Sequence, residues 1–408
     1  MSQSPESGVD RRDLFKAAAT GILLLKPEIV FGSQANSTVE MGLIGCGGRG
    51  NWLAPFFPEY TGARIVALAD IVKTKLDTTA DKLKVDSART YHGPNAYKEL
   101  AHSKVDGVII ETPTYFHTMQ AAAAVDAGKH VYCAKPIAVD VPSSKDFLTA
   151  GDKAKQKNLS FWVDFQSRAQ PVFQEVASRI HRGDLGKVAL AQVFYFAGRP
   201  WKDKPMPDVD PGQKRMTNWF GDRIISGDII VEQNIHVIDM ANWFLGGHPL
   251  KANGTGGRTD WSGTANNFGD AYDHFVVSYW YPNDTHASFS SHQLNGSVAD
   301  LCVRCIGVNG CADTHYGGLV RIASGDPKIA WMGAEKDDTF KSGCVANIKT
   351  FIESVRTGKP VNNAAVAVES NLTAILGRTA AYEQRTVTWD EMMASKDRWK
   401  LDLKLDWA

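Results

Sequence analysis

The sequence has 408 residues, of which 43% are hydrophobic and 22% charged, a composition typical of a soluble globular protein with more than one domain. Because 45 Lys and Arg residues balance 45 Asp and Glu residues, there is no basic excess to drive binding to nucleic acid or to an anionic membrane. Six cysteines in a chain of this length are too few for a disulfide-dense scaffold.

Residues 1–36 are expected to be a targeting segment rather than part of the fold. The pair Arg11-Arg12 precedes an apolar stretch from Ala17 to Leu25, which is shorter than the roughly 20 residues needed to span a bilayer. This pattern resembles a twin-arginine export signal. We therefore expect a periplasmic or otherwise exported protein with no stable membrane span. A basic, disordered N-terminal arm is the alternative.

A glycine-rich loop follows the first apolar run, from Val39 to Ile44, which predicts a buried strand. Glycines then recur at the spacing G-x-G-x-x-G. The first permits a tight turn, the second lets a pyrophosphate approach the backbone, and the third lets the next helix pack closely. The free N–H groups of that helix would face the phosphates. The expected cofactor loop consists of Gly45, Gly47, Gly48, Arg49 and Gly50.

A second apolar run, from Ala63 to Ala69, ends in Asp70. A carboxylate about 20 residues beyond the first glycine is suited to bind the adenosine ribose of a dinucleotide. Together with the loop, it predicts a dinucleotide-binding Rossmann fold. Asp70 would repel the 2′-phosphate of NADP, so NAD is expected. Arg49 and Lys73 leave NADP possible, and a glycine-rich loop in a phosphate-free α/β protein is the alternative.

Further strands and helices alternate after Asp70. Val105 to Glu111 and Lys129 to Cys133 predict buried strands on either side of an alanine-rich helix. This alternation predicts a parallel, doubly wound sheet, in which ligands bind beyond the carboxyl ends of the strands. Besides Asp70, the residues expected at that edge around the cofactor are Thr112, Pro113, His117, Lys135 and Pro136.

Lys135 is the first candidate catalytic residue. A lysine beside a nicotinamide can donate to a sugar hydroxyl or stabilise the alkoxide as hydride leaves. Burial and the nicotinamide cation would lower its pKa. Pro136 would fix the turn that aims Lys135. A strand-end lysine in a surface ion pair is the alternative.

The second candidate centre lies between Gly227 and Leu245, where Glu232, His236 and Asp239 stand at i, i+4 and i+7. On one helix they would share a face. His236 is suited to proton transfer near neutral pH, and Glu232 could hold its tautomer or contact a sugar. A zinc site and a structural histidine are alternatives. We expect no metal, because the pattern is not H-E-x-x-H and no second ligand cluster is visible.

Candidate substrate contacts surround a proline-rich stretch, residues 198–213, that has no regular periodicity and is typical of a lid or binding loop. Trp201 and Trp219 flank this stretch, and their aromatic faces are suited to stacking on sugar rings. Arg168 follows an apolar run from Ser160 to Phe165. We expect Arg168, Trp201 and Trp219 to bind substrate, with packing anchors as the alternative for the tryptophans.

The remainder of the chain predicts an α+β domain. Strands separated by turn signals indicate a large, mostly antiparallel sheet with one face on helices and the other open or in an oligomer interface. Cys302, Cys305 and Cys311 are expected to be free. The expected strands are Ala271 to Tyr281, Thr285 to Gln293, Leu301 to Val308 and Gly318 to Ile322, and the expected helices are Ala346 to Arg356 and Val366 to Glu383.

The expected organisation is therefore a targeting arm over residues 1–36, a Rossmann NAD(P)-binding domain over 37–158, an α+β substrate and oligomerisation domain over 159–385, and a C-terminal tail over 386–408. The fold class is α/β for the first domain and α+β for the second.

The glycine loop, Asp70, Thr112-Pro113 with His117, and Gly128 to Cys133 resemble the Gfo/Idh/MocA family of glucose–fructose oxidoreductase and inositol dehydrogenase relatives. The resemblance covers nearly everything after residue 37. The family has Glu-Lys-Pro where this chain has Ala134-Lys135-Pro136, and that Glu helps set the environment of the lysine and the nicotinamide. Its second-domain signature places an acid, usually Asp, four residues before a catalytic histidine, which here are Glu232 and His236.

The resemblance implies an NAD(P)-dependent oxidoreductase that removes hydride from a sugar, polyol or glycoside carbon while His236 takes the hydroxyl proton. It also implies a homo-oligomer, a dimer or tetramer. Because the twin-arginine route moves folded proteins, the cofactor is hypothesised to be tightly held and recycled. Two other functions stay open: an NAD-dependent glycosidase that works by transient oxidation, elimination and re-reduction, and a sugar or nucleotide sensor without turnover.

Overall fold

The computed structural model describes residues 38–200, 210–259, 261, 269–333, 339–403 and 405, leaving out the side chain at position 339. The targeting arm and Trp201 lie outside the described residues. None of the described helices is both long enough and apolar enough to cross a membrane.

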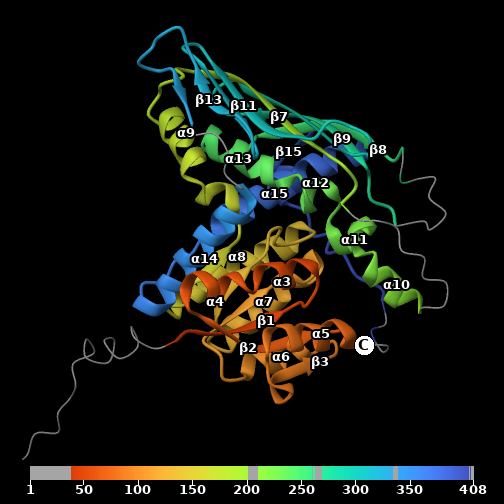
Figure 1. The fold of residues 1–408 in the computed structure, drawn as a ribbon. Helices are drawn as coiled ribbons and strands as arrows, with labels where there is room; N and C mark the ends of the chain where they lie inside the picture. The colour runs from red at the N-terminus through yellow and green to blue at the C-terminus, as the bar shows by residue number, and fades with distance from the viewer. Residues whose placement is uncertain are drawn as a thin grey trace, which may run out of the picture. The chain divides into compact units, whose positions relative to one another are not determined.

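Six parallel strands form the first sheet, in the order β3-β2-β1-β4-β5-β6 (Figure 1). The residues of its central strands are mostly apolar and buried, because helices cover both faces of a parallel sheet. This half is the expected Rossmann fold. The strands are β1 (Glu40–Ile44), β2 (Arg64–Asp70), β3 (Thr90–His92), β4 (Gly107–Ile110), β5 (His130–Cys133) and β6 (Phe161–Val163), and the helices are α3 (Gly48–Leu53), α4 (Phe56–Thr61), α5 (Lys73–Leu83), α6 (Ala96–His102), α7 (His117–Asp126) and α8 (Val141–Gln156).

The first sheet extends beyond the boundary expected at residue 158. β6 pairs in parallel with β5, with Val131 opposite Phe161 and Cys133 opposite Val163. The apolar run from Ser160 to Phe165 is therefore the last strand of the Rossmann half rather than the first strand of the second half. The strand needs a neighbour for its backbone groups, and the edge of β5 provides it.

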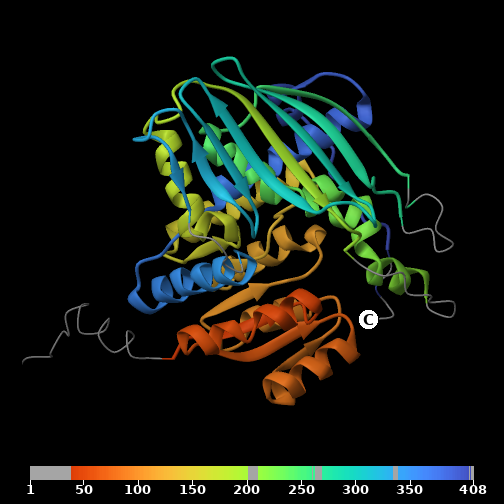
Figure 2. The ribbon, with the colours of Figure 1, turned by 45° about the horizontal axis from the view of Figure 1, so that its top comes forward.

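Nine strands form the second sheet, in the order β14-β13-β12-β11-β7-β10-β9-β8-β15 (Figure 2). Only β7 and β10 pair in parallel among its described strands, so the sheet is mostly antiparallel, as expected. The strands are β7 (Val188–Ala197), β8 (Lys251–Gly257), β9 (His274–Tyr281), β10 (Thr285–Gln293), β11 (Asp300–Gly307), β12 (Cys311–His315), β13 (Val320–Ala323), β14 (Trp331–Met332) and β15 (Val387–Thr388).

Sequence analysis missed strand β12. Its centre is Asp313, whose carboxylate pairs with the guanidinium of Arg304 on the neighbouring strand β11. A strand that buries a paired charge lacks the simple alternation of apolar and polar residues from which strands are recognised.

Helices from the second half pack on both sheets. α13 and α15 lie against one face of the nine-stranded sheet, whereas α14 returns to the first sheet, where Cys344, Ile348 and Phe351 share a core with Leu43 of β1 (Figure 1). These helices are α9 (Pro171–His181), α10 (Pro211–Thr217), α11 (Arg223–Ser226), α12 (Ile229–Glu232), α13 (Ile235–Leu245), α14 (Thr339–Thr357), α15 (Ala364–Glu383) and α16 (Trp389–Met393).

Candidate active site

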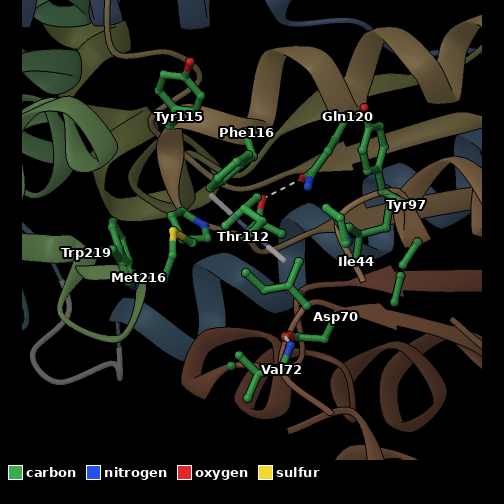
Figure 3. Close-up of a pocket in the computed structure, with 18 of the residues that line it drawn as sticks. Ile44, Asp70, Val72, Tyr97, Thr112, Tyr115, Phe116, Gln120, Met216 and Trp219 are labelled. Carbon is green, nitrogen blue, oxygen red and sulfur yellow. Dashed lines mark hydrogen bonds between the residues drawn. The ribbon is translucent and has the colours of Figure 1, made fainter. Parts of the chain in front are cut away.

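A cavity of about 420 Å³ opens at the carboxyl ends of β1, β2 and β4 (Figure 3). The hydroxyl of Thr112 donates to Oε1 of Gln120 across one of its walls, at 2.6 Å. Most of the predicted cofactor residues meet here because the strands that carry them are neighbours in the sheet. The predicted residues that line the cavity are Gly45, Gly47, Gly48, Arg49, Asp70, Thr112 and Pro113.

The glycine loop fits a pyrophosphate. A Cβ added at Gly47 or Gly48 would meet no atom within 4 Å, so the backbone there is open to a ligand. Gly45 has φ of +99°, and a Cβ on Gly50 would lie 2.1 Å from the carbonyl oxygen of Gly45. The turn and the close approach of α3 to β1 therefore require glycine at these two positions.

Asp70 fits the ribose. Its Oδ2 accepts a hydrogen bond from the backbone N–H of Cys46 and its Oδ1 accepts one from Val72, both at 2.7 Å. These two bonds fix the carboxylate on the wall of the cavity. Each oxygen keeps a second acceptor site, so the carboxylate can still accept from a ribose hydroxyl.

Four predicted cofactor residues do not line the cavity: Gly50, His117, Lys135 and Pro136. The His117 ring is buried, with Nδ1 and Nε2 each 2.6 Å from a carbonyl oxygen, of Pro136 and Thr112 respectively. Burial lowers the pKa of His117 to about 4, against the opposing effect of the two carbonyl groups. The residue ties the loop after β4 to the loop after β5, which contains the cis peptide bond between Lys135 and Pro136.

Lys135 and Glu232 bring the two halves of the chain into contact. The amine of Lys135 donates to the backbone carbonyl of Glu232 at 2.6 Å and lies 3.6 Å from its Oε1. The other carboxylate oxygen accepts from the hydroxyl of Thr114 at 2.7 Å. Both charged side chains are nearly buried, at 12% and 10% exposed, so this is not the surface ion pair considered above. Burial lowers the pKa of Lys135 and raises that of Glu232.

His236 is buried and carries a neutral ring. Its Nδ1 has no hydrogen-bond partner among the described residues, and the rings of Tyr316 and Phe340 lie 6.3 Å from its own, measured between centroids. Burial lowers the pKa of His236 well below 6.5, and the positive charges of Lys135 and Arg49 act in the same direction. An imidazole that is neutral at pH 7 can accept a proton.

The expectation that one helix carries Glu232, His236 and Asp239 is wrong. Glu232 ends α12, and α13 begins at Ile235 after a break at residues 233 and 234. The side chain of Gln233 in this break accepts a hydrogen bond from the hydroxyl of Tyr195 at 2.7 Å, and asparagine at 234 is a weak helix former. Glu232 consequently reaches toward Lys135 rather than along a shared helix face.

Asp239 and Arg168 bind each other. Both carboxylate oxygens of Asp239 accept from Nε of Arg168, at 2.8 and 3.0 Å, and Oδ1 also accepts from the hydroxyl of Ser370. The guanidinium lies over the ring of Trp243. Within the described residues no hydrogen bond joins Asp239 to His236, so the expected orienting partner of the base is instead half of a largely buried ion pair.

Trp219 lines the cofactor cavity together with Met216 and Thr217 (Figure 3). Its ring was expected to stack on a sugar, whereas the structure places it in the wall of the nucleotide site. This placement follows from the position of α10 and the short 3₁₀ turn Trp219–Gly221 beside the first sheet. Trp201, its predicted counterpart, lies outside the described residues.

Sequence analysis missed the C-terminal tail as part of this site. The backbone N–H of Trp399 donates to Asp140 at 2.8 Å, and that of Leu401 donates to the hydroxyl of Tyr115 at 3.2 Å. The alternation of leucine at every second position was the signal that could have identified an extended segment with one apolar face. The tail residues that line the cavity are Leu401, Leu403 and Leu405.

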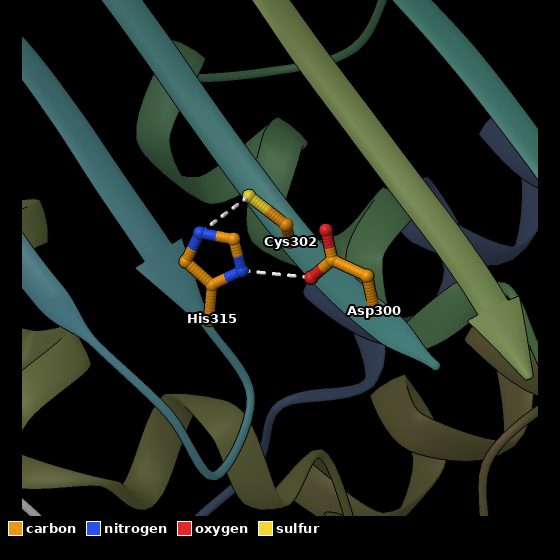
Figure 4. A group of neighbouring side chains, drawn as sticks. All are labelled: Asp300, Cys302 and His315. Carbon is orange, nitrogen blue, oxygen red and sulfur yellow. Dashed lines mark hydrogen bonds and ion pairs between the residues drawn. The ribbon is translucent and has the colours of Figure 1, made fainter. Parts of the chain in front are cut away.

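Asp300, Cys302 and His315 form a separate polar cluster on β11 and β12 (Figure 4). Nδ1 of His315 lies 2.7 Å from Asp300, and its Nε2 lies 3.2 Å from Asp313, which also pairs with Arg304. These groups are already partnered by one another. All six cysteines are free, as expected for Cys302, Cys305 and Cys311.

Comparison with known families matches both halves of the chain. Residues 39–165 match the model of the GFO/IDH/MocA oxidoreductase family with an NAD-binding Rossmann fold. Residues 173–312 match the model of the GFO/IDH/MocA C-terminal domain. The two matches together cover more than half of the chain, and the first one assigns NAD binding to the half that holds the cavity.

Curated relatives include inositol 2-dehydrogenase of Rhizobium meliloti (strain 1021), 28% identical over 53% of this chain and 58% of the relative. Another is scyllo-inositol 2-dehydrogenase (NAD(+)) of Bacillus subtilis (strain 168), 26% identical over 53% of this chain and 57% of the relative. The chain thus spans a little more than half the length of these relatives.

Solved structures share the whole fold. Aldose-aldose oxidoreductase from Caulobacter crescentus, in complex with glycerol, aligns over 86% of this chain and 100% of its own with a TM-score of 0.69 and 21% identity. Scyllo-inositol dehydrogenase from Lactobacillus casei, with bound NAD(H) and scyllo-inositol, aligns over 87% and 100% with a TM-score of 0.68 and 19% identity. These likenesses establish the two-sheet architecture.

Proposed function

Because the chain belongs to the Gfo/Idh/MocA oxidoreductase family, we propose that it oxidises a hydroxyl-bearing carbon of a sugar, polyol or glycoside, with NAD(P)⁺ as the hydride acceptor. The observation that carries this proposal is the buried contact between Lys135 and Glu232, with a neutral His236 on the same charged cluster. An amine that can donate to oxygen and an imidazole that can accept a proton are the two groups that oxidation of an alcohol needs.

A nicotinamide dinucleotide held by the glycine loop and Asp70 would supply the acceptor for the hydride, that is, for the hydrogen and the electron pair of the C–H bond. The imidazole of His236 accepts the proton of the hydroxyl group, so that a carbonyl forms. The ammonium of Lys135 donates to the same oxygen and stabilises its negative charge as the proton leaves. Glu232 holds Lys135 through its carboxylate and its backbone carbonyl.

Relatives support this substrate class. Inositol dehydrogenases are among the sequence relatives, and an aldose-aldose oxidoreductase and a levoglucosan dehydrogenase are among the structural neighbours. Their names give inositol, an aldose and levoglucosan as substrates. This chain would meet the same kind of substrate with Lys135 and His236.

We propose further that the protein is exported and that it keeps its cofactor bound. The paired arginines Arg11 and Arg12 resemble a signal for export of folded proteins. Outside the cell's main nucleotide pool a lost cofactor would not be replaced. Three leucines of the C-terminal tail line the cavity, where they would slow the exit of a bound dinucleotide.

A second candidate is the glycosidase reaction by transient oxidation, elimination and re-reduction. The observation that favours it is Ala134 at the position where the family has Glu, beside the catalytic lysine. A changed environment at Lys135 is consistent with a cofactor that is reduced and reoxidised within one cycle. After water adds to the unsaturated intermediate left by elimination, re-reduction would release the sugar, so that glycoside and water become sugar and aglycone with no net change in NAD(P).

The deciding experiment is mass spectrometry of nucleotide released from the native protein, before and after incubation with a panel of sugars and glycosides. Net NADH with an oxidised sugar supports the oxidoreductase, and aglycone without net NADH supports the glycosidase.

Lys135→Ala and His236→Ala should each lower kcat by about 10²- to 10⁴-fold, whereas the exposed Lys328→Ala should change nothing. Turnover that survives both site substitutions would refute the assigned roles, and absence of turnover on every panel member would favour the sensor.

Homo-oligomerisation is proposed for the outer face of the second sheet, the face opposite α13 and α15. Val276 on β9 points out of this face and is 53% exposed. A large sheet face with exposed apolar side chains is typical of a contact surface. Sedimentation equilibrium of the purified protein measures the state, and a monomeric mass would contradict a dimer or tetramer.

A further inference from the structure

Glu111 is a buried carboxyl group that the proposed reaction does not use. It follows β4 and is among the residues that line the cofactor cavity. Its side chain is fully buried, and neither carboxylate oxygen has a hydrogen-bond partner among the described residues. Buried carboxylates are normally hydrogen-bonded, since an unpaired charge is costly away from water.

The sheet register places Glu111 in a row with Ala134 and Asp164. The backbone N–H of Ala134 donates to the carbonyl of Ile110, and that of Asp164 donates to the carbonyl of Cys133, both at 2.9 Å. Each of the three residues therefore directly follows its strand, on β4, β5 and β6. Ala134 has no acidic group of its own and stands between two carboxyl-bearing neighbours.

Arg49 crosses this row from the glycine loop. Its Nη2 donates to Oδ2 of Asp164 at 2.7 Å, whereas its Nε stays 3.7 Å from Oε2 of Glu111, too far for a hydrogen bond. The second nearby cation, Lys135, is held by Glu232. Both cations are thus hydrogen-bonded to other residues, and Glu111 shares Arg49 with Asp164 through a longer ion pair that contains no hydrogen bond.

The remaining groups that face Glu111 are uncharged at neutral pH. They are the hydroxyl of Tyr132 and the thiol of Cys133 on β5, together with the thiol of Cys344 on α14, which touches Arg49 and Asp164. An ionised Glu111 would therefore be a third negative charge against two positive ones. Burial raises the pKa of Glu111 to about 8, Asp164 and Glu232 act in the same direction, and Arg49 and Lys135 oppose them.

The order of the strands puts Glu111 on the path of the cofactor. Along the sheet edge, Asp70 ends β2, the glycine loop follows β1, Glu111 follows β4 and Lys135 follows β5. A dinucleotide that reaches from the ribose site at Asp70 to Lys135 must pass Glu111. The oxidised nicotinamide carries a positive charge, and the reduced one does not.

We propose that Glu111 senses the oxidation state of the cofactor: it carries a proton in the free protein and releases it to solvent when the cationic NAD⁺ binds, so that the site favours NAD⁺ over NADH. The negative charge of the ionised carboxylate then balances the positive charge of the nicotinamide in this site. This inference rests on NAD binding alone, so it holds or fails independently of the reaction proposed above for sugars.

The test is titration calorimetry of nucleotide-free protein with NAD⁺ and with NADH, in two buffers of different ionisation enthalpy. At pH 7 we expect NAD⁺ to release close to one proton per site and NADH to release none. Glu111→Gln should abolish the proton release on NAD⁺ binding. It should also lower the ratio of the affinity for NAD⁺ to the affinity for NADH by about tenfold. The exposed Glu99→Gln should leave both quantities unchanged. Equal proton release by the two nucleotides, or unchanged release in Glu111→Gln, overturns the proposal.

Two further measurements keep the test decisive if Glu111→Gln does not fold. In the wild-type protein the affinity for NAD⁺ should rise about thirtyfold from pH 6 to pH 8 while that for NADH stays constant, because only NAD⁺ competes with the proton. The double variant Glu111→Gln/Ala134→Glu returns a carboxyl group to the next position of the row and should restore proton release. Flat affinity for both nucleotides, or a fully folded double variant without proton release, contradicts the inference.

Discussion

At the scale of single residues, burial sets the protonation states on which the proposed chemistry depends. The pKa of Lys135 is lowered by desolvation, and that of His236 is lowered further by the positive charge of Lys135. Burial, with the neighbouring cations acting in the same direction, thus keeps the imidazole neutral. The same burial raises the pKa of Glu232, against the opposing effects of Lys135 and of the hydrogen bond from Thr114.

The pH dependence of turnover should report His236. Its neutral form is the base, so activity is complete above its pKa and falls as pH drops through it. Because that pKa lies well below 6.5, the acid limb of kcat/KM should have its midpoint below pH 6.5. Steady-state rates from pH 4.5 to 8, with a substrate found in the panel, measure it. An acid limb centred above pH 6.5 would mean that another group is the base.

At the scale of elements, the C-terminal tail differs from an ordinary chain end. The ring of Trp399 stacks on the buried guanidinium of Arg378, whose Cζ lies 4.0 Å from the centroid of that ring. The backbone N–H of Trp399 also donates a hydrogen bond to Asp140. These anchors precede Leu401, Leu403 and Leu405, which form part of the cavity wall. The described part of the tail therefore belongs to the nucleotide site.

Replacing the three tail leucines with alanine should speed the release of nucleotide. The variant Leu401→Ala/Leu403→Ala/Leu405→Ala removes apolar contacts from the cavity wall, and the loss of about 1.4 kcal/mol of contact energy would raise the dissociation rate about tenfold. Stopped-flow fluorescence of NADH displacement measures this rate. Leu250→Ala, at an exposed position, is the matched control. An unchanged rate in the triple variant would show that the tail does not retain the cofactor.

At the scale of the whole molecule, the proposed chemistry requires both halves of the chain. Lys135 follows the first sheet, and Glu232 and His236 come from helices associated with the second. Residues from late in the chain also pack against the first sheet: those of α14 share its core, and at β6 the N–H of Phe161 donates to the carbonyl of Val361 while the N–H of Asn363 donates to the carbonyl of Phe161. The site can form only after the two halves have packed together, as export in the folded state would require.

Substitution of both arginines of the N-terminal pair should block export. Arg11→Lys/Arg12→Lys keeps the charge but removes the paired guanidinium groups that define the resemblance to a twin-arginine signal. We expect the variant to accumulate inside the cell as folded protein, as measured by fractionation and by the nucleotide it carries. Arg64→Lys, an exposed site in the first sheet, is the control. Normal export of the double variant would identify residues 1–36 as an arm with another role.

Local pattern was enough to predict the nucleotide site. The glycine spacing, Asp70 and the alternation of strands and helices each reflect a constraint within a few residues or between consecutive elements, and the cavity lies where they placed it. Lys135 was likewise expected just after a strand and follows β5, although it is not among the residues that line the cavity. The Rossmann half and the mostly antiparallel second sheet were likewise predicted from periodicity and turns.

Tertiary structure decided which side chains became partners. Arg168 and Asp239 are 71 positions apart and neutralise each other, and Leu401 is bound to Tyr115 across 286 positions. In the sequence, Glu111 was visible only as the end of a strand. Its lack of hydrogen-bond partners depends on how Arg49, Asp164 and Lys135 are bound to other groups. Such contacts join segments far apart in sequence, and the energy of a buried charge depends on all its neighbours at once, which no local pattern contains.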